Sequence, residues 1–156
     1  MRVSREQARE NRQSILKAAG RLFRERGIDA AGVDDITRAA GLTHGGFYGH
    51  FDSKQSLTAE AVARALSIST EAWCSTSRGS RPEHAFRTLI GKYLAPEHRD
   101  FPGHGCALAA LGGEIARQPK VVRRSFTGGL DKMIETLSGI LPGATKRERE
   151  DRKSVV

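Results

Sequence analysis

The chain has 156 residues, 38% of them hydrophobic and 28% charged, which suits a folded domain with a buried core and excludes a disordered polyelectrolyte. Its formal net charge of +8 favours an anionic partner, but residues 1–52 carry nine Lys/Arg against seven Asp/Glu, so the excess charge is not concentrated there. Two cysteines make no disulfide framework, and there is neither an apolar signal segment nor a run of about 20 apolar residues. A cytoplasmic location without a membrane span is therefore expected.

A long first helix is expected from near Ser4 to near Arg26. Its apolar residues recur at helical spacing and are followed by a glycine that stops it: Ile15, Ala19, Leu22, Phe23 and Gly27. The early turns place four arginines on one stripe: Arg2, Arg5, Arg9 and Arg12. Two interpretations of this stripe stay open, a solvated face paired with nearby glutamates and a basic arm lying along phosphates.

A short second helix is expected from about Val33 to Ala40, with Gly41 in the left-handed conformation that often ends a helix. Leu42 is the apolar plug of the turn, and Thr43 is a good N-cap for another helix. A helix, a glycine-containing turn of about three residues and a second helix make the helix-turn-helix layout.

The stretch THGGFYGHF (residues 43–51) holds three glycines between two helical patterns. Each interior glycine costs a helix about 0.5–1 kcal/mol relative to alanine, so a purely structural helix has little reason to keep them. A helix that presses its backbone against another molecule has such a reason, and the recognition helix of a helix-turn-helix is one. Phe47 and Phe51 are four residues apart and are expected to pack inward against the first two helices.

The same stretch offers hydrogen-bond donors where a recognition helix meets DNA. Thr43 and His44 stand at its N-terminal turn, where a hydroxyl and free backbone N–H groups can hold a phosphate. Tyr48 and His50 can donate to phosphate oxygens, and Lys54 adds a positive charge at the start of the next helix. The two histidines do not share a helix face, and no P-loop or metal motif is present, so neither a metal nor a cofactor is expected.

The rest of the chain is expected to be helical, with polar breaks. Helices are expected from Ser53 to about Thr76, from Pro82 to about Leu94, from Cys106 to Gln118 and from Lys120 to about Leu141. The first of these has a predicted buried stripe of Leu57, Ala61, Ala65 and Ile68. Residues 95–105 are expected to form a loop, and no β-alternation persists anywhere.

Residues 12–57 resemble the DNA-binding domain of the tetracycline-repressor (TetR) family. The resemblance lies in ILKAAGRLFRERG (15–27), VDDITRAAGLTHGGFYGHF (33–51) and SKQSL (53–57). The segment from Tyr93 to Arg117 is similar, less specifically, to the ligand-binding region of one branch of these repressors.

This resemblance implies an all-α protein with a three-helix DNA-binding head at residues 1–52 and a helical ligand-binding and dimerisation body at residues 53–156. It implies a transcriptional regulator rather than an enzyme, a repressor that a small molecule releases from its operator. The implied partners are double-stranded operator DNA, an unidentified small-molecule effector and a second copy of the chain, with no membrane. Carried over by position, the implied DNA contacts are Thr43, His44, Gly45, Tyr48, His50 and Lys54.

Two departures from the family pattern matter. Ala31 and Gly32 stand where the family often has a hydroxyl pair that caps the second helix and touches phosphate. The chain also stops at Val156, before most of the two long helices that usually form the dimer interface. A truncated or inert helical interaction module without specific DNA binding is therefore the alternative function.

Candidate residues for a ligand pocket are large side chains of the body: Trp73, Phe86, Tyr93, Leu108 and Met133. The competing interpretation is that helical spacing places them in an ordinary core. Cys106 is expected at a helix start near His104, an environment that lowers a thiol pKa, so it is a candidate redox sensor. The competing interpretation is a small buried apolar residue.

Overall fold

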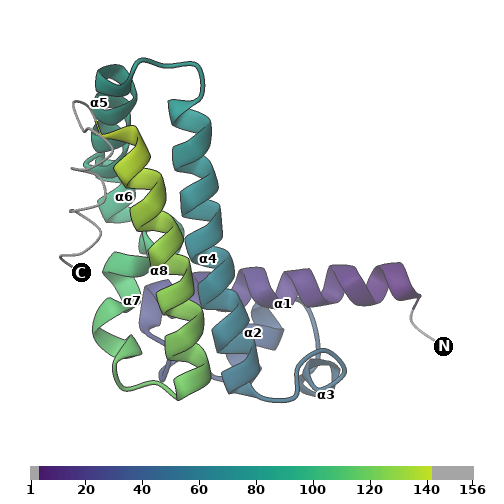
Figure 1. The fold of residues 1–156 in the computed structure, drawn as a ribbon. Coiled ribbons are helices and arrows are strands. Elements are labelled where there is room, and N and C mark those ends of the chain that lie inside the picture. The colour runs from purple at the N-terminus through teal and green to yellow at the C-terminus, as the bar shows by residue number, and fades with distance from the viewer. Residues whose placement is uncertain (1–3, 142–156) are drawn as a thin grey trace.

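The computed structural model describes residues 4–141, and within this range the chain is helical without β-strands. The all-α prediction is confirmed (Figure 1). The elements are α1 (Arg5–Arg26), α2 (Val33–Ala39), α3 (His44–Phe47), α4 (Lys54–Ser77), α5 (Pro82–Tyr93), α6 (Pro96–Asp100), the 3-10 helix η1 (Pro102–His104), α7 (Ala107–Ile115) and α8 (Lys120–Ile140). The expected shortage of C-terminal helices concerns residues outside the described range.

The ends of α1 follow from local chemistry. The Ser4 hydroxyl caps it by accepting a hydrogen bond from the Gln7 amide at 3.1 Å. Gly27 ends it with φ +89°, and its N–H donates to the Phe23 carbonyl at 2.8 Å. The predicted bounds of this helix are therefore confirmed.

The α2–α3 turn is also built as its sequence predicts. Gly41 has φ +73°, and the Leu42 N–H returns to the Thr37 carbonyl at 2.8 Å, which closes the end of α2. Thr43 occupies the N-cap position of α3, although its hydroxyl makes no capping hydrogen bond. Helix α3 is a single turn, followed by Ser53, whose hydroxyl caps α4.

Helices α4 and α8 lie side by side and form the most extensive helix pair of the described residues (Figure 1). Their close approach depends on Gly129, where a Cβ would lie 2.6 Å from Leu66 Cδ1 and 2.9 Å from Leu66 Cβ. The lower part of this pair meets α1, which contacts α2, and α2 in turn contacts α3; α5 packs near the upper end of the pair in the view of Figure 1.

One hydrophobic cluster runs from the first three helices into the body. It includes Phe23 and Phe47 on one side and Leu111, Phe126 and Met133 on the other. A smaller cluster joins Ala85 and Leu89 of α5 to Ile140 of α8. The division between residues 52 and 53 stays a prediction, and the main cluster spans it.

Two structural expectations were wrong. Residues 95–105 are not a loop, because Pro96 and Pro102 each start a short helix, which a fixed φ near −65° favours. The predicted buried stripe of α4 also fails at Ile68, which is 55% exposed, whereas Leu66 is fully buried. Ile68 faces a cavity between α4 and α5 instead of the main core.

Candidate nucleic-acid interface

The predicted contact residues lie together on α3 and the first turn of α4. Thr43, His44, Gly45 and Tyr48 are exposed, whereas His50 and Lys54 are half-buried. The Lys54 ammonium donates to the Asp29 carbonyl at 3.3 Å, which holds its charge beside the loop that leads into α2.

Two aromatic side chains fix residues 43–51, here called the recognition turn, on the core. Phe47 and Phe51 are 0% and 3% exposed, and their rings stack with centroids 5.8 Å apart. The prediction that both pack inward is confirmed. Tyr48 packs edge-on against Phe47 at 5.2 Å and still leaves 60% of its surface exposed. The buried rings thus anchor the recognition turn to the core, while its outer face stays accessible to solvent.

The glycines of the turn have no packing reason inside the chain. A Cβ on Gly45 would have no neighbour within 4 Å, and on Gly46 or Gly49 its nearest neighbours would be at an ordinary 3.6 Å. Space inside the fold would therefore admit alanine at all three positions. Their absence of side chains leaves a backbone surface that a partner molecule can approach closely.

His44 is held by a residue that the sequence analysis did not single out. Its Nδ1 is hydrogen-bonded to the Asp34 carboxylate of α2, and its ring lies 5.6 Å from the Tyr48 ring. Asp34 and His44 are ten residues apart, so helical periodicity gives no signal for this pair. The contact ties α2 to the N-terminal turn of α3.

The arginine stripe of α1 divides into two parts. Arg5 and Arg9 are exposed, and Arg2 lies outside the described residues. Arg12 makes two hydrogen bonds to Glu60 of α4, and its guanidinium lies 4.6 Å from the Phe51 ring centroid. The hydrogen bonds with Glu60 raise the pKa of Arg12 above its ordinary value. Arg12 therefore clamps α1 to α4 rather than extending a basic arm.

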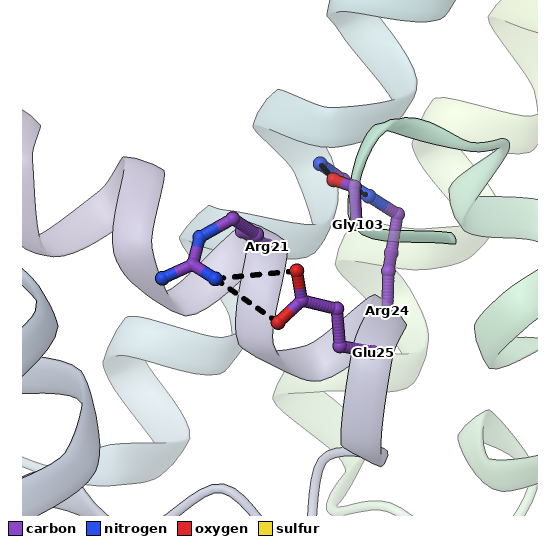
Figure 2. A network of polar contacts seen from close by, with 4 residues as sticks. All are labelled: Arg21, Arg24, Glu25 and Gly103. Carbon is purple, nitrogen blue, oxygen red and sulfur yellow. Dashed lines mark hydrogen bonds and ion pairs between the residues drawn. The ribbon is translucent and has the colours of Figure 1, made fainter. Parts of the chain in front are cut away.

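The C-terminal end of α1 is tied to the body by a polar network (Figure 2). Arg24 donates through Nε to the Gly103 carbonyl at 2.9 Å, and Arg21 pairs with Glu25 at 3.1 Å. Burial lowers the pKa of Arg24 below its ordinary value. A Cβ on Gly103 would lie 2.4 Å from Glu25 Oε1 and 2.9 Å from Arg21 Cγ, so this contact requires glycine or a shift of both side chains.

A second tie joins the α1–α2 loop to α7. The Ile28 amide donates to Glu114 Oε2 at 2.8 Å. Gln118 donates to the Asp29 carboxylate at 3.1 Å. Head and body are therefore connected by polar bonds as well as by the shared core.

A cavity of about 300 Å³ lies between α4, α5 and the segment that precedes α7. It brings together three predicted residues, Trp73, Tyr93 and Cys106, with two histidines, His98 and His104. Burial, followed by the nearby Cys106 thiol, raises the pKa of Tyr93 above its ordinary value. The Cys106 amide donates to His98 Nε2 at 3.3 Å, and the Tyr93 and His98 rings lie 4.6 Å apart.

The other predicted pocket residues do not line this cavity. Met133 is 1% exposed in the main cluster, Leu108 packs against that cluster, and Phe86 packs against the smaller one. Cys106 is 6% exposed, which fits a packing role better than a reactive thiol; its role as a sensor stays a prediction. A larger surface cavity between α4 and α8, about 570 Å³, was not predicted; it is lined by small residues and by Arg78, Arg124 and Lys132.

Comparison with known proteins finds a family match in the N-terminal part of the chain. Residues 15–61 match the family described as "Bacterial regulatory proteins, tetR family". Over these residues, the chain matches the TetR family. The match covers α2, α3 and the turn between them, where the expected contacts lie.

Curated proteins resemble this chain over part of their length. The HTH-type transcriptional repressor DhaR of Mycobacterium sp. (strain GP1) is 29% identical over 112 residues, which are 72% of this chain and 56% of DhaR. The HTH-type transcriptional regulator AcrR of Shigella flexneri is 41% identical over 59 residues, 38% of this chain and 27% of AcrR. The chain thus spans about half or less of the length of these relatives.

Solved structures share the fold over nearly the whole chain. A TetR-family transcriptional regulator from Agrobacterium tumefaciens has a TM-score of 0.79 at 20% identity, covering 94% of this chain and 82% of that one. The reduced form of E. coli NemR has a TM-score of 0.78 at 18% identity, with 93% and 80% covered. At such identities the likeness concerns the fold alone. None of the helices within residues 4–141 is long and apolar enough to cross a membrane.

Proposed function

We propose that this chain is a DNA-binding transcriptional regulator, a repressor that a small molecule releases from its operator. The observation that carries the proposal is the head that matches the TetR family. Its recognition turn exposes Thr43, His44 and Tyr48 to solvent and is packed on the core through two stacked, buried phenylalanine rings. Exposed polar groups on an anchored helix in a helix-turn-helix are the arrangement that reads duplex DNA. The glycines of the turn support close approach by the DNA backbone.

The cavity at Trp73, Tyr93 and Cys106 is the proposed effector site. A volume of about 300 Å³ suits a small, largely apolar molecule that polar groups at His98 and His104 orient. The segment that lines the cavity continues directly into Gly103, which Arg24 of α1 holds. A ligand that displaces this segment therefore moves α1, and with it the recognition turn.

The proposed partners are operator DNA, this effector and a second copy of the chain, in the cytoplasm. Two heads on one duplex explain how such a small recognition turn gains affinity, because each head binds one half-site. Light scattering at micromolar concentration tests the second copy. A dimer supports it, and a monomer that still binds DNA specifically contradicts it.

The test of DNA binding is fluorescence anisotropy with the duplex that lies upstream of the reading frame, against a scrambled duplex. Binding is expected to favour the upstream duplex and to fall steeply with salt, by a logarithmic slope of about 0.9 for each phosphate contact. Lys54→Ala should weaken binding to every sequence and reduce this slope by about 1.

Lys132→Ala is the matched control, because Lys132 is exposed on α8, away from the proposed interface. It removes the same charge and should leave the slope unchanged. Equal, salt-insensitive binding of the upstream duplex and a panel of random duplexes by the parent protein contradicts the proposed function. An unchanged slope in Lys54→Ala contradicts only the assignment of Lys54.

A further inference from the structure

Asp34 and His44 form a hydrogen-bonded pair at the face proposed to meet DNA. His44 Nδ1 contacts Asp34 Oδ1 across the turn between α2 and α3. Both residues are accessible, with 54% of the His44 side chain and 69% of the Asp34 side chain exposed. His44 Nε2 has no hydrogen-bond partner within residues 4–141. One ring nitrogen is therefore occupied, and the other is available to a molecule bound at this face.

The chemistry of the pair fixes which nitrogen of the neutral ring carries the proton. An ionised carboxylate only accepts hydrogen bonds, so Nδ1 must be the donor toward Asp34. A neutral imidazole has one N–H, and Nε2 is then an acceptor. Without the carboxylate, either nitrogen is free to hold the proton, and Nε2 has no fixed polarity.

We propose that Asp34 determines base specificity by fixing His44 Nε2 as a hydrogen-bond acceptor toward the major groove. This inference rests on the proposed DNA binding and deepens it. In the major groove, adenine and cytosine offer an exocyclic amino donor, whereas guanine offers the acceptors N7 and O6 at its own edge. An acceptor at Nε2 selects an amino group and rejects guanine, so Asp34 is a positioning residue that acts through His44.

Protonation of His44 reverses the polarity of Nε2, because both nitrogens of an imidazolium donate. Two groups face the ring among the described residues, Asp34 from α2 and Tyr48 from α3. Asp35, the next residue of α2, pairs instead with Arg38 at 3.6 Å.

The experiment uses the full chain and a library of random duplexes. Duplexes are selected at about pH 8, and the affinity is then measured for variants of the winning duplex with each base pair changed in turn. The proteins are the parent, Asp34→Asn and Asp35→Asn. Asp35→Asn is the matched control, because it removes one negative charge from the adjacent position of α2 without touching His44.

The parent and Asp35→Asn are expected to prefer adenine or cytosine over guanine about tenfold at one position of the site at about pH 8. Asp34→Asn should lose it to within about twofold, because an amide fixes neither tautomer. A purely structural role of Asp34 would lower the affinity for all duplexes equally and leave the preference intact.

Retention by Asp34→Asn of the full preference that Asp35→Asn shows overturns the inference. Circular dichroism shows whether Asp34→Asn is folded. If it is not, His44→Gln decides the matter, because an amide that both donates and accepts should not reject guanine. Undiminished rejection of guanine by His44→Gln overturns the inference, whereas selection of no sequence by the parent overturns the proposed function itself.

Discussion

The glycines of the recognition turn and those of the body occupy opposite environments. A Cβ on Gly45 would meet nothing within 4 Å, whereas a Cβ on Gly129 or Gly103 would collide with neighbours at 2.6 Å or 2.4 Å. The body glycines are explained by packing within the chain, of α8 on α4 and of η1 on α1. Within residues 4–141 the turn glycines have no such explanation, which fits the close approach of DNA proposed above. Environment, rather than residue type, thus separates a structural glycine from a functional one.

The largest effect is expected for Gly129→Ala. The added methyl group would overlap Leu66 at its Cβ as well as at its flexible end, so α4 and α8 must separate or Leu66 must leave its rotamer. Overpacking of this kind lowers the free energy of unfolding by about 1–3 kcal/mol. Chemical denaturation of the variant measures it.

Gly128→Ala is the control for this substitution, since a Cβ there has open space and the helix gains about 0.5–1 kcal/mol from alanine. Equal stability of the two variants would mean that α8 does not pack on α4 through Gly129.

Gly103→Ala is expected to have a smaller effect. The methyl group would meet Glu25 and Arg21, whose side chains can move, so we expect a loss of about 1 kcal/mol. The displaced network includes the Arg24 bond to the Gly103 carbonyl, so the thermal midpoint and the effector response should fall together. Differential scanning calorimetry checks the first, and DNA release checks the second. A variant with parental stability and parental effector response would show that the contact between Gly103 and Arg24 does not couple the body to α1.

Gly45→Ala should stabilise the fold while it weakens DNA binding. Alanine favours the helix over glycine by about 0.5–1 kcal/mol, and no atom of residues 4–141 opposes the methyl group. Gly41→Ala is the contrasting variant, because its φ of +73° makes a side chain costly by about 1–2 kcal/mol. Urea denaturation and anisotropy are measured on both. A stabilised Gly45→Ala that binds DNA like the parent would remove the case for close approach at this turn.

The smallest effect concerns Tyr93, whose pKa burial raises above its ordinary value of about 10. A raised folded-state pKa means that the native state binds the proton more tightly, so this contribution to stability is complete below about pH 10 and is lost as pH rises above it. The chain has two tyrosines, so Tyr48→Phe leaves Tyr93 as the sole phenol for an ultraviolet titration. A midpoint equal to that of the urea-denatured protein would contradict the partial burial of Tyr93 beside the cavity.

Local chemistry made most of the helices predictable. Ser4, Gly27 and Gly41 mark helix ends through capping and positive φ, both of which depend on the residue itself and its near neighbours. The segment 95–105 was mispredicted because Pro96 and Pro102 break a preceding helix and start a new one equally well.

The site was only half predictable, for a related reason. The recognition turn is contiguous in sequence, so its exposed residues were found. Arg12 contacts Glu60 from 48 positions away, and Asp34 contacts His44 across a turn, so periodicity gives no sign of either pair. Only the folded chain reveals that Arg12, one arginine of the stripe, is a clamp between α1 and α4 and that His44 has a fixed partner in Asp34.

The single cluster that joins Phe23 and Phe47 to Phe126 and Met133 has a consequence for protein engineering. If the head of another protein replaced residues 1–52, its inner side chains would pack against the body within this apolar cluster. Cavities or steric overlaps would result unless those side chains matched the present ones in volume. Deletion of residues 1–52 would expose the apolar side chains of the body that belong to this cluster and would favour aggregation. Calorimetry of the intact chain should accordingly record one melting transition, in which the head and the body unfold at the same temperature.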